Sequence, residues 1–203
     1  MALEQRVIEH GWNILLASQS PRRQELLSGC GVPFTTIRFE VDESYPEDIK
    51  VEDVPEYLSK IKSQGYPNPV GVKDIVITAD TVVISGDKIL GKPKDREDAI
   101  SMLSALSGES HRVITGVTLR THNQTISFSS ESRVKFTSLT QEQIEYYIDR
   151  YRPFDKAGSY GCQEWIGYVA IENIEGSFYN IMGLPTDKLY YHIDRLVKGT
   201  SKN

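Results

Sequence analysis

The chain of 203 residues contains only two cysteines, Cys30 and Cys162, with no CxxC pair and no Cys/His cluster of the kind that binds metal. This scarcity excludes a disulfide-built scaffold and a structural zinc site, and it favours a reducing compartment. No apolar run approaches the roughly 18 residues of a membrane span, and residues 1–12 hold no apolar segment of signal-peptide length. We therefore expect a cytoplasmic protein with no membrane partner.

Positive charge is also in short supply. The 23 Lys and Arg residues are outnumbered by 28 Asp and Glu residues, which gives a net charge of −5. Proteins that bind nucleic-acid polymers are usually basic, so we exclude that class, although a local cationic pocket could still hold a small phosphorylated ligand. The sequence has no Walker A loop, no GxGxxG, no internal repeat and no low-complexity segment. We expect one domain over 1–203, with an N-terminal extension at 1–12 and a C-terminal tail at 198–203.

Strand and helix signals alternate along the chain. They mix crossover with hairpin connections, which predicts a mixed α/β sheet rather than a plain doubly wound one. Strands are predicted at 13–17, 34–39, 75–85, 111–120, 125–129 and 132–137. Helices are predicted at 21–28, 51–63, 95–106, 140–150 and 185–197. Residues 169–174 and 178–181 are typical of a hairpin around Glu175 and Gly176.

The most informative local pattern spans residues 15–27. An apolar run ends in small polar residues, Ser20 is a good N-cap, and Pro21 suits the first helical position. Arg22 and Arg23 follow in the first turn, where the helix dipole disfavours cations by roughly 0.3–1 kcal/mol each. An anion bound at this turn would reverse that penalty, since free N–H groups and two guanidiniums would converge on it. The alternative is a solvated basic pair on a surface helix.

Acidic residues supply the second signal. Asp80 follows a run typical of a buried strand, where a bare carboxylate is costly unless it is paired or bound to metal. Sites in α/β sheets gather at the carboxyl ends of strands. The alternative is a structural Asp that accepts hydrogen bonds from Thr78, Thr81 or a loop. Asp42 and Glu43 could join Asp80 in holding a hard divalent cation, or they could be solvated loop acids.

Two lysines and one loop complete the set. Lys62, near the end of an amphipathic helix, and Lys92, in a Gly-Lys-Pro turn, could meet phosphate oxygens, or they could be solvent lysines. Residues 155–163, Asp-Lys-Ala-Gly-Ser-Tyr-Gly-Cys-Gln, have the composition of a binding loop, although an ordinary connection is the alternative. Within it, Tyr160 offers a face for stacking and Gln163 an amide that suits reading a base edge.

Two further residues are of types that often act in catalysis. His111 could serve as a general base and Cys162 as a nucleophile, but the sequence shows no Ser/His/Asp or Cys/His arrangement around them. We predict that His111 is structural and that Cys162 is a small buried residue.

Taken together, these segments resemble the Maf family of nucleoside triphosphate pyrophosphatases, which is related in fold to the Ham1-type inosine triphosphatases. The resemblance runs from about residue 14 to 189 and rests on five motifs in the family's order. They are Ala-Ser-Gln-Ser-Pro-Arg-Arg at 17–23, Thr-Ala-Asp-Thr at 78–81, Leu-Gly-Lys-Pro at 90–93, the loop at 155–163 and Met-Gly-Leu-Pro at 182–185. The resemblance implies a mixed twisted sheet with flanking helices and two lobes around a central active-site cleft.

The resemblance also implies a reaction. A nucleoside triphosphate would be hydrolysed between its α- and β-phosphates with the help of Mg²⁺ or Mn²⁺, and Asp80 would be the catalytic acid/base residue. Substrate choice would involve Arg23, Thr81 and Gln163. The family places a metal-binding acid, usually Glu, at Asp42, so Asp42 and Glu43 are both candidates beside Asp80. The residues implied in phosphate binding are Ser18, Arg22, Arg23, Lys62 and Lys92.

The motifs at 78–81 and 155–161 look like those of the branch that acts on dTTP and UTP, and CTP and modified pyrimidine nucleotides are further candidate substrates. Glu-Trp-Ile at 164–166 departs from the glycine-rich continuation common in that branch. The alternatives are a 7-methyl-GTP pyrophosphatase and a nucleotide-binding regulator of septum formation with little hydrolysis. A homodimer is expected from the family alone.

Overall fold

Seven strands form one sheet in the part of the chain that the computed structural model describes, residues 2–199. They are β1 (Asn13–Leu16), β2 (Thr35–Thr36), β3 (Asp74–Ser85), β4 (Lys88–Leu90), β5 (Ser110–Arg120), β6 (Thr125–Phe136) and β7 (Ile171–Glu175). Their spatial order is β2-β1-β3-β5-β6-β7, and β4 pairs with β3 beside this path. Because β1 runs parallel to β2 and β3 while the other pairs are antiparallel, the predicted mixed α/β sheet is confirmed.

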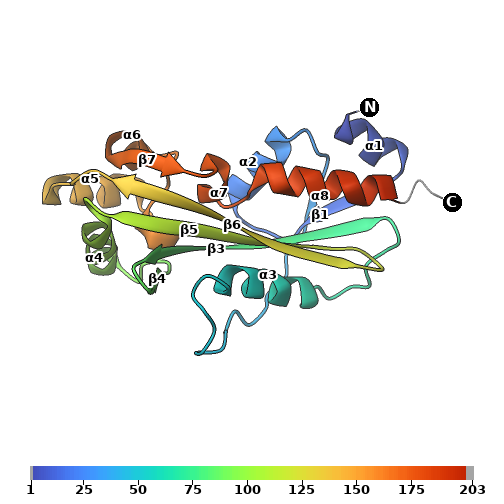
Figure 1. Cartoon of the computed structure of the whole chain (residues 1–203), viewed down its shortest axis with the longest axis horizontal. Helices are drawn as coiled ribbons and strands as arrows, with labels where there is room; N and C mark the ends of the chain where they lie inside the picture. Colours follow the sequence, from blue (N-terminus) through green and yellow to red (C-terminus); the bar gives the residue numbers. More distant parts are fainter. Residues whose placement is uncertain (1, 200–203) are drawn as a thin grey trace.

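Helices cover both faces of this sheet. They are α1 (Leu3–Glu9), α2 (Pro21–Gly29), α3 (Val54–Gln64), α4 (Arg96–Leu106), α5 (Gln141–Tyr151), α6 (Trp165–Ala170), α7 (Phe178–Ile181) and α8 (Thr186–Gly199), with a 3-10 turn, η1, at Ala157–Ser159. Figure 1 shows α3 along one face and α8 along the other, with α1 and α2 on the side of α8. None of the described helices is long and apolar enough to cross a membrane.

The face that carries α3 also carries the predicted catalytic acid. Val54 and Leu58 of α3 pack on Val82 and Ile84 of β3 in a small buried cluster. Since alternate residues of a strand share a face, Asp80 lies on the same side of the sheet as these two β3 residues. The α3 helix is therefore the element that covers Asp80.

Strand pairing leaves a gap beside Asp80. Along one edge of β3, pairing with β1 reaches Ile77 and pairing with β4 starts at Val83. Among the described strands, none pairs with this edge of β3 between those two residues, whereas β5 pairs with the opposite edge throughout. The strand predicted at 75–85 is therefore confirmed, and Asp80 does not lie at the carboxyl end of a strand, where sites in α/β sheets usually gather. It stands within β3, at an interruption in the sheet.

Three strand predictions are wrong in their extent, and one helix was missed. The segments 125–129 and 132–137 form one continuous strand, β6, because it pairs with β5 along its length. Of 34–39, only two residues pair with β1. The α1 helix was not predicted, yet its Leu3 and Val7 are buried in the main core.

The hairpin predicted around Gly176 is also wrong. Its first limb begins only at Ile171, because the residues before it belong to α6. Its second limb is the helix α7, which begins where the side chain of Ser177 accepts a hydrogen bond from the N–H of Asn180. Of the predicted tail at 198–203, residues 198 and 199 end α8 and residues 200–203 lie outside the described chain.

Candidate active site

A cavity of about 410 Å³ opens at the interruption in β3, a size within the usual range for small-molecule sites. A second hollow of about 580 Å³ adjoins it and shares much of its charged lining. The predicted residues that line the first cavity are Arg22, Arg23, Glu43, Lys62, Asp80, Thr81, Lys92, Tyr160 and Gln163. Ser18 lines the second hollow. The structure thus gathers segments that are up to 145 positions apart in the chain, from Ser18 to Gln163, around one open region.

One lysine joins two acids at the centre of this region. Lys62 lies in the last turn of α3, and its Nζ is 2.6 Å from Oδ1 of Asp80 and 3.0 Å from Oε2 of Glu43. The side chains of Lys62 and Asp80 are largely buried, whereas that of Glu43 is exposed. The α3 helix packs closely on β5 at Gly116, the residue paired with Asp80, where an added Cβ would lie 2.3 Å from the backbone of Pro55 and Glu56.

The two neighbouring arginines are placed differently. Ser20 caps α2 as predicted, and its side chain accepts a hydrogen bond from the N–H of Arg23. Arg22 reaches outward, with its NH1 2.9 Å from Oδ2 of Asp155. Arg22 therefore lines the cavity and is bonded to the loop at 155–163.

Arg23 is bonded instead to the framework around Asp80. Its Nε donates to the carbonyl of Gly183 at 2.8 Å and its NH1 to the carbonyl of Ala79 at 2.9 Å. Its NH2 donates to Oγ1 of Thr81 at 3.1 Å. Burial lowers the pKa of the guanidinium, and the nearby Asp80 carboxylate partly opposes that change. Arg23 therefore supplies a fixed positive charge and also ties α2 to the open edge of β3.

Ser18 and Lys92 occupy the rim. Oγ of Ser18 accepts a hydrogen bond from the N–H of Ser20 at 3.2 Å, which leaves its own hydroxyl proton available to a ligand. Lys92 is exposed and lines both hollows. The carbonyl of Gly91 accepts from the N–H of Gly158 at 3.0 Å, so the lysine turn is attached to the loop at 155–163.

That loop is built around residues that the sequence reasoning did not single out as site residues. Lys156 is 8% exposed, and its Nζ lies 2.7 Å from Oδ1 of Asp155 and 3.1 Å from Oε1 of Glu164. Oε2 of Glu164 also accepts a hydrogen bond from the hydroxyl of Tyr147, in α5. The sequence does predict that Tyr147 is buried, because Ile144, Tyr147 and Ile148 are spaced as one face of a helix, and they form the buried face of α5.

Tyr160 lines the cavity but offers little surface to a ligand. It is 5% exposed, and its hydroxyl lies 2.8 Å from Nε2 of His111. Its ring packs edge-on against His111 and Phe136. The structure therefore does not provide the free stacking face expected of Tyr160, whereas Gln163 is partly exposed at the cavity wall.

The structural readings of His111 and Cys162 are confirmed. His111 is buried, and burial lowers its pKa to about 4. Cys162 is buried as well, and burial raises the pKa of its thiol to about 12. Neither is a ready base or nucleophile at neutral pH.

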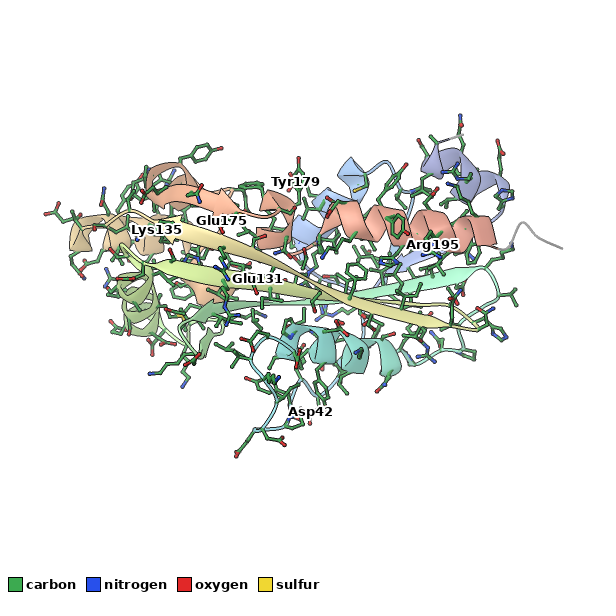
Figure 2. All side chains as sticks on the ribbon, in the orientation of Figure 1. Asp42, Glu131, Lys135, Glu175, Tyr179 and Arg195 are labelled. Atoms are coloured by element: carbon green, nitrogen blue, oxygen red, sulfur yellow. The ribbon has the colours of Figure 1, made fainter. Side chains whose placement is uncertain are left out.

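The three acids expected to hold a metal ion do not all meet. Both oxygens of Asp42 are bonded to Ser44, its Oδ1 to the N–H at 2.9 Å and its Oδ2 to the hydroxyl at 3.1 Å. Figure 2 shows Asp42 on the loop outside α3. Among the described residues, no three His, Cys, Asp or Glu side chains form a ready metal cluster. Glu43 and Asp80, which contact the same ammonium, are the two acids that the fold brings together.

The chain is similar to known proteins over most of its length. A family model described as Maf-like protein matches residues 13–196. The chain is 50% identical over 186 residues to the dTTP/UTP pyrophosphatase of Bacteroides thetaiotaomicron, covering 91% of this chain and 96% of the relative. It is 52% identical over 182 residues to the dTTP/UTP pyrophosphatase of Porphyromonas gingivalis, covering 88% and 92%. Among solved structures, the chain is similar to the Staphylococcus aureus Ham1 protein over 89% of this chain and 99% of that one, with 13% identity and a TM-score of 0.48.

Proposed function

Because this chain belongs to the Maf family, we propose that it is a nucleoside triphosphate pyrophosphatase that hydrolyses dTTP and UTP to the monophosphate and pyrophosphate. The observation that carries the proposal is the gathering of five cationic residues in the same cavity as Asp80, in a chain whose net charge is −5; they are Arg22, Arg23, Lys62, Lys92 and Lys156. A triphosphate is the small ligand that such a local reversal of charge suits best. The names of the relatives above support dTTP and UTP as its substrates.

The phosphate chain would lie between α2, α3 and the turn at 91–93. Arg22, Lys62 and Lys92 reach this space from three separate elements, so they can contact different phosphate oxygens at once. Arg23 and the Ser18 hydroxyl would complete the phosphate site. Fixed cations of this kind stabilise the negative charge that develops on a departing pyrophosphate.

Asp80 would act on the attacking water. The carboxylate takes a proton from water as the new O–P bond forms, and the bond to the bridging oxygen between the α- and β-phosphates breaks. The electron pair of the broken bond leaves with pyrophosphate. Lys62, bonded to Oδ1, would hold the carboxylate in the direction needed for this transfer.

The acids also fit a divalent cation. Mg²⁺ needs only one or two protein carboxylates when substrate phosphates and water supply its other ligands, and Glu43 and Asp80 offer such a pair. When bound there, Mg²⁺ or Mn²⁺ would supply further neutralisation of the phosphate charge. We propose Glu43 rather than Asp42 as the second ligand, since Asp42 does not line either hollow.

At the other end of the cavity, the Gln163 amide would read the base. It can accept from the N3–H of uracil or thymine and donate to a ring carbonyl, which suits dTTP and UTP. Arg23 and Thr81, which are bonded to each other, would shape the neighbouring wall.

The test is a pyrophosphate-release assay with dTTP, UTP, CTP and 7-methyl-GTP, each with Mg²⁺, Mn²⁺ or chelator. We expect equal amounts of monophosphate and pyrophosphate from dTTP and UTP, with no release in chelator. An Asp80→Asn variant, which keeps the side-chain size, should lose roughly 10²–10⁴-fold in kcat. Near-normal turnover by that variant would exclude the mechanism. Preference for 7-methyl-GTP would instead identify the chain as a 7-methyl-GTP pyrophosphatase. Binding without turnover would favour a regulatory role.

Three expectations from the sequence stay predictions. A cytoplasmic site of action is supported by two free cysteines. The family supports a homodimer, and the single continuous sheet supports a single domain whose cleft divides two lobes.

A further inference from the structure

The turn that carries Gln163 is held at both ends by one phenol. The N–H of Glu164 donates to the carbonyl of Gly161 at 3.0 Å, which closes a four-residue turn with Gln163 in its third position. The hydroxyl of Tyr147 accepts from the N–H of Gly161 at 3.0 Å and donates to the carboxylate of Glu164. The first and last residues of the turn are therefore bonded to the same oxygen.

Tyr147 reaches this turn from the core. Its side chain is fully buried in α5, its ring stacks on Tyr151, and it lines neither hollow of the active site. Burial and the Glu164 carboxylate raise its pKa well above the ordinary range of a phenol, so the hydroxyl keeps the proton that it donates. Any effect of Tyr147 on a ligand must pass through the turn.

A buried ion pair supports the same carboxylate. Lys156 Nζ contacts Glu164 on one side and Asp155 on the other, and Asp155 in turn binds Arg22. Without Glu164, the buried ammonium would keep one acidic partner, which is costly in a desolvated place. Glu164 is therefore held from two sides, by Tyr147 and by Lys156.

The rest of the surroundings leave the turn little freedom. A side chain at Gly167, in the first turn of α6, would begin 1.8 Å from the carbonyl oxygen of Cys162, so α6 packs directly against the back of the turn. Among the described residues, the one hydrogen-bond contact of the Gln163 amide is weak, with the Cys162 thiol 3.9 Å from Oε1. The amide therefore depends on the turn backbone for its place in the cavity.

We propose that Tyr147 and Glu164 are positioning residues that hold Gln163 in the geometry for recognising the pyrimidine base, with Lys156 securing Glu164. The inference rests on the proposed function, because it assumes that Gln163 reads the base of the substrate. Its consequence is that the two residues act on binding of the base and leave phosphate binding and the chemical step alone.

The test separates base recognition from phosphate recognition. We would measure KM and kcat for UTP, and inhibition by inorganic tripolyphosphate in excess Mg²⁺, for Tyr147→Phe and Glu164→Gln. Tyr147→Phe removes both hydrogen bonds of the hydroxyl, and Glu164→Gln keeps a single acceptor oxygen where Tyr147 and Lys156 now have one each; both variants keep the side-chain size. We expect the KM for UTP to rise at least about tenfold, the effect of one or two lost hydrogen bonds, while kcat and the tripolyphosphate inhibition constant stay near the wild-type values. Tyr146→Phe removes the hydroxyl of the adjacent residue, which is 50% exposed; it is the matched control and should leave all three quantities unchanged.

Two results would overturn the inference. One is an unchanged KM in both folded variants, and the other is an equal loss in UTP and tripolyphosphate binding, which a general loosening of the site would produce. If Tyr147→Phe does not fold, the nearly isosteric Glu164→Gln decides alone. A wild-type protein that releases no pyrophosphate would defeat the proposed function itself, whereas active variants with unchanged KM would defeat only this inference.

Discussion

The ammonium of Lys62 lies 2.6 Å from Oδ1 of Asp80, and the two residues belong to elements on either side of the site, α3 and β3. Both side chains are largely buried, with 17% and 14% of their surface exposed. Glu43 adds a third charge at 3.0 Å from the same ammonium. The lysine is therefore the group that keeps two acids close together before any substrate or cation arrives.

Replacing Lys62 with Met should expose this dependence. The variant keeps much of the apolar stem but leaves the carboxylates of Asp80 and Glu43 without their shared partner. Hydrogen bonds to charged groups contribute about 1.5–3 kcal/mol, so we expect kcat/KM for UTP to fall about 10- to 100-fold. Lys60→Met removes an exposed lysine of the same helix and should behave as wild type. Pyrophosphate release by the two variants is the measurement, and equal rates would contradict the assigned role of Lys62.

The adjacent arginines should separate in their effects. Arg23→Ala leaves the carbonyls of Ala79 and Gly183 without a donor, so the free energy of unfolding should fall by about 2 kcal/mol or more. Arg22→Ala removes a partly exposed ion pair with Asp155, which contributes no more than about 1 kcal/mol. We expect both variants to bind UTP more weakly, but only Arg23→Ala to unfold at clearly lower urea concentration. Equal urea midpoints would show that the Arg23 contacts do not support the fold.

Local chemistry predicted the start of the site. The Ser20 cap and the helix after it are confirmed, and Asp80 lies in the cavity beside Lys62, while its catalytic role stays a prediction. The motifs therefore identified which residues line the cavity, with Asp42 and the Tyr160 face as the exceptions.

The remainder depends on contacts distant in sequence. The gap in pairing beside Asp80 depends on where β1 ends and β4 begins along one edge of β3, and no local pattern records those partners. The Tyr147 hydroxyl contacts Glu164 only when α5 packs against α6. The distance between these two residues in the sequence therefore does not predict their hydrogen bond. In α7, the apolar residues suited a strand, but the Ser177 cap and the burial of Asn180 outweighed that preference.

Buried His111 should make folding sensitive to mild acid. Its pKa in the folded protein is about 4, against an ordinary value of 6.5, because burial disfavours its charged form. Between those pH values the unfolded chain binds a proton that the folded protein does not, so stability falls as the pH falls through this window, by up to about 3 kcal/mol. Urea unfolding of wild type and His111→Gln at pH 7 and pH 4.5 would check this. Gln can still bond the Tyr160 hydroxyl, and we expect a smaller loss in that variant. An identical loss in both proteins would assign the acid sensitivity to other groups.

Gly116 should couple the packing of α3 to catalysis. It pairs with Asp80 across the sheet, and an added Cβ would lie 2.3 Å from the backbone of Pro55 and Glu56 at the start of α3. Backbone cannot yield as a flexible side chain does, so Gly116→Ala must push the helix outward, at a cost of about 1–3 kcal/mol. Because Lys62 lies on that helix, its ammonium should move away from Asp80, and kcat/KM should fall even at temperatures where the variant is fully folded. Gly29→Ala is the control, since nothing lies within 4 Å of a Cβ there. The measurements are pyrophosphate release and thermal unfolding. A destabilised variant with normal activity would show that the contact between Lys62 and Asp80 does not depend on the position of α3. A variant normal in both measurements would show that α3 need not pack so closely on β5.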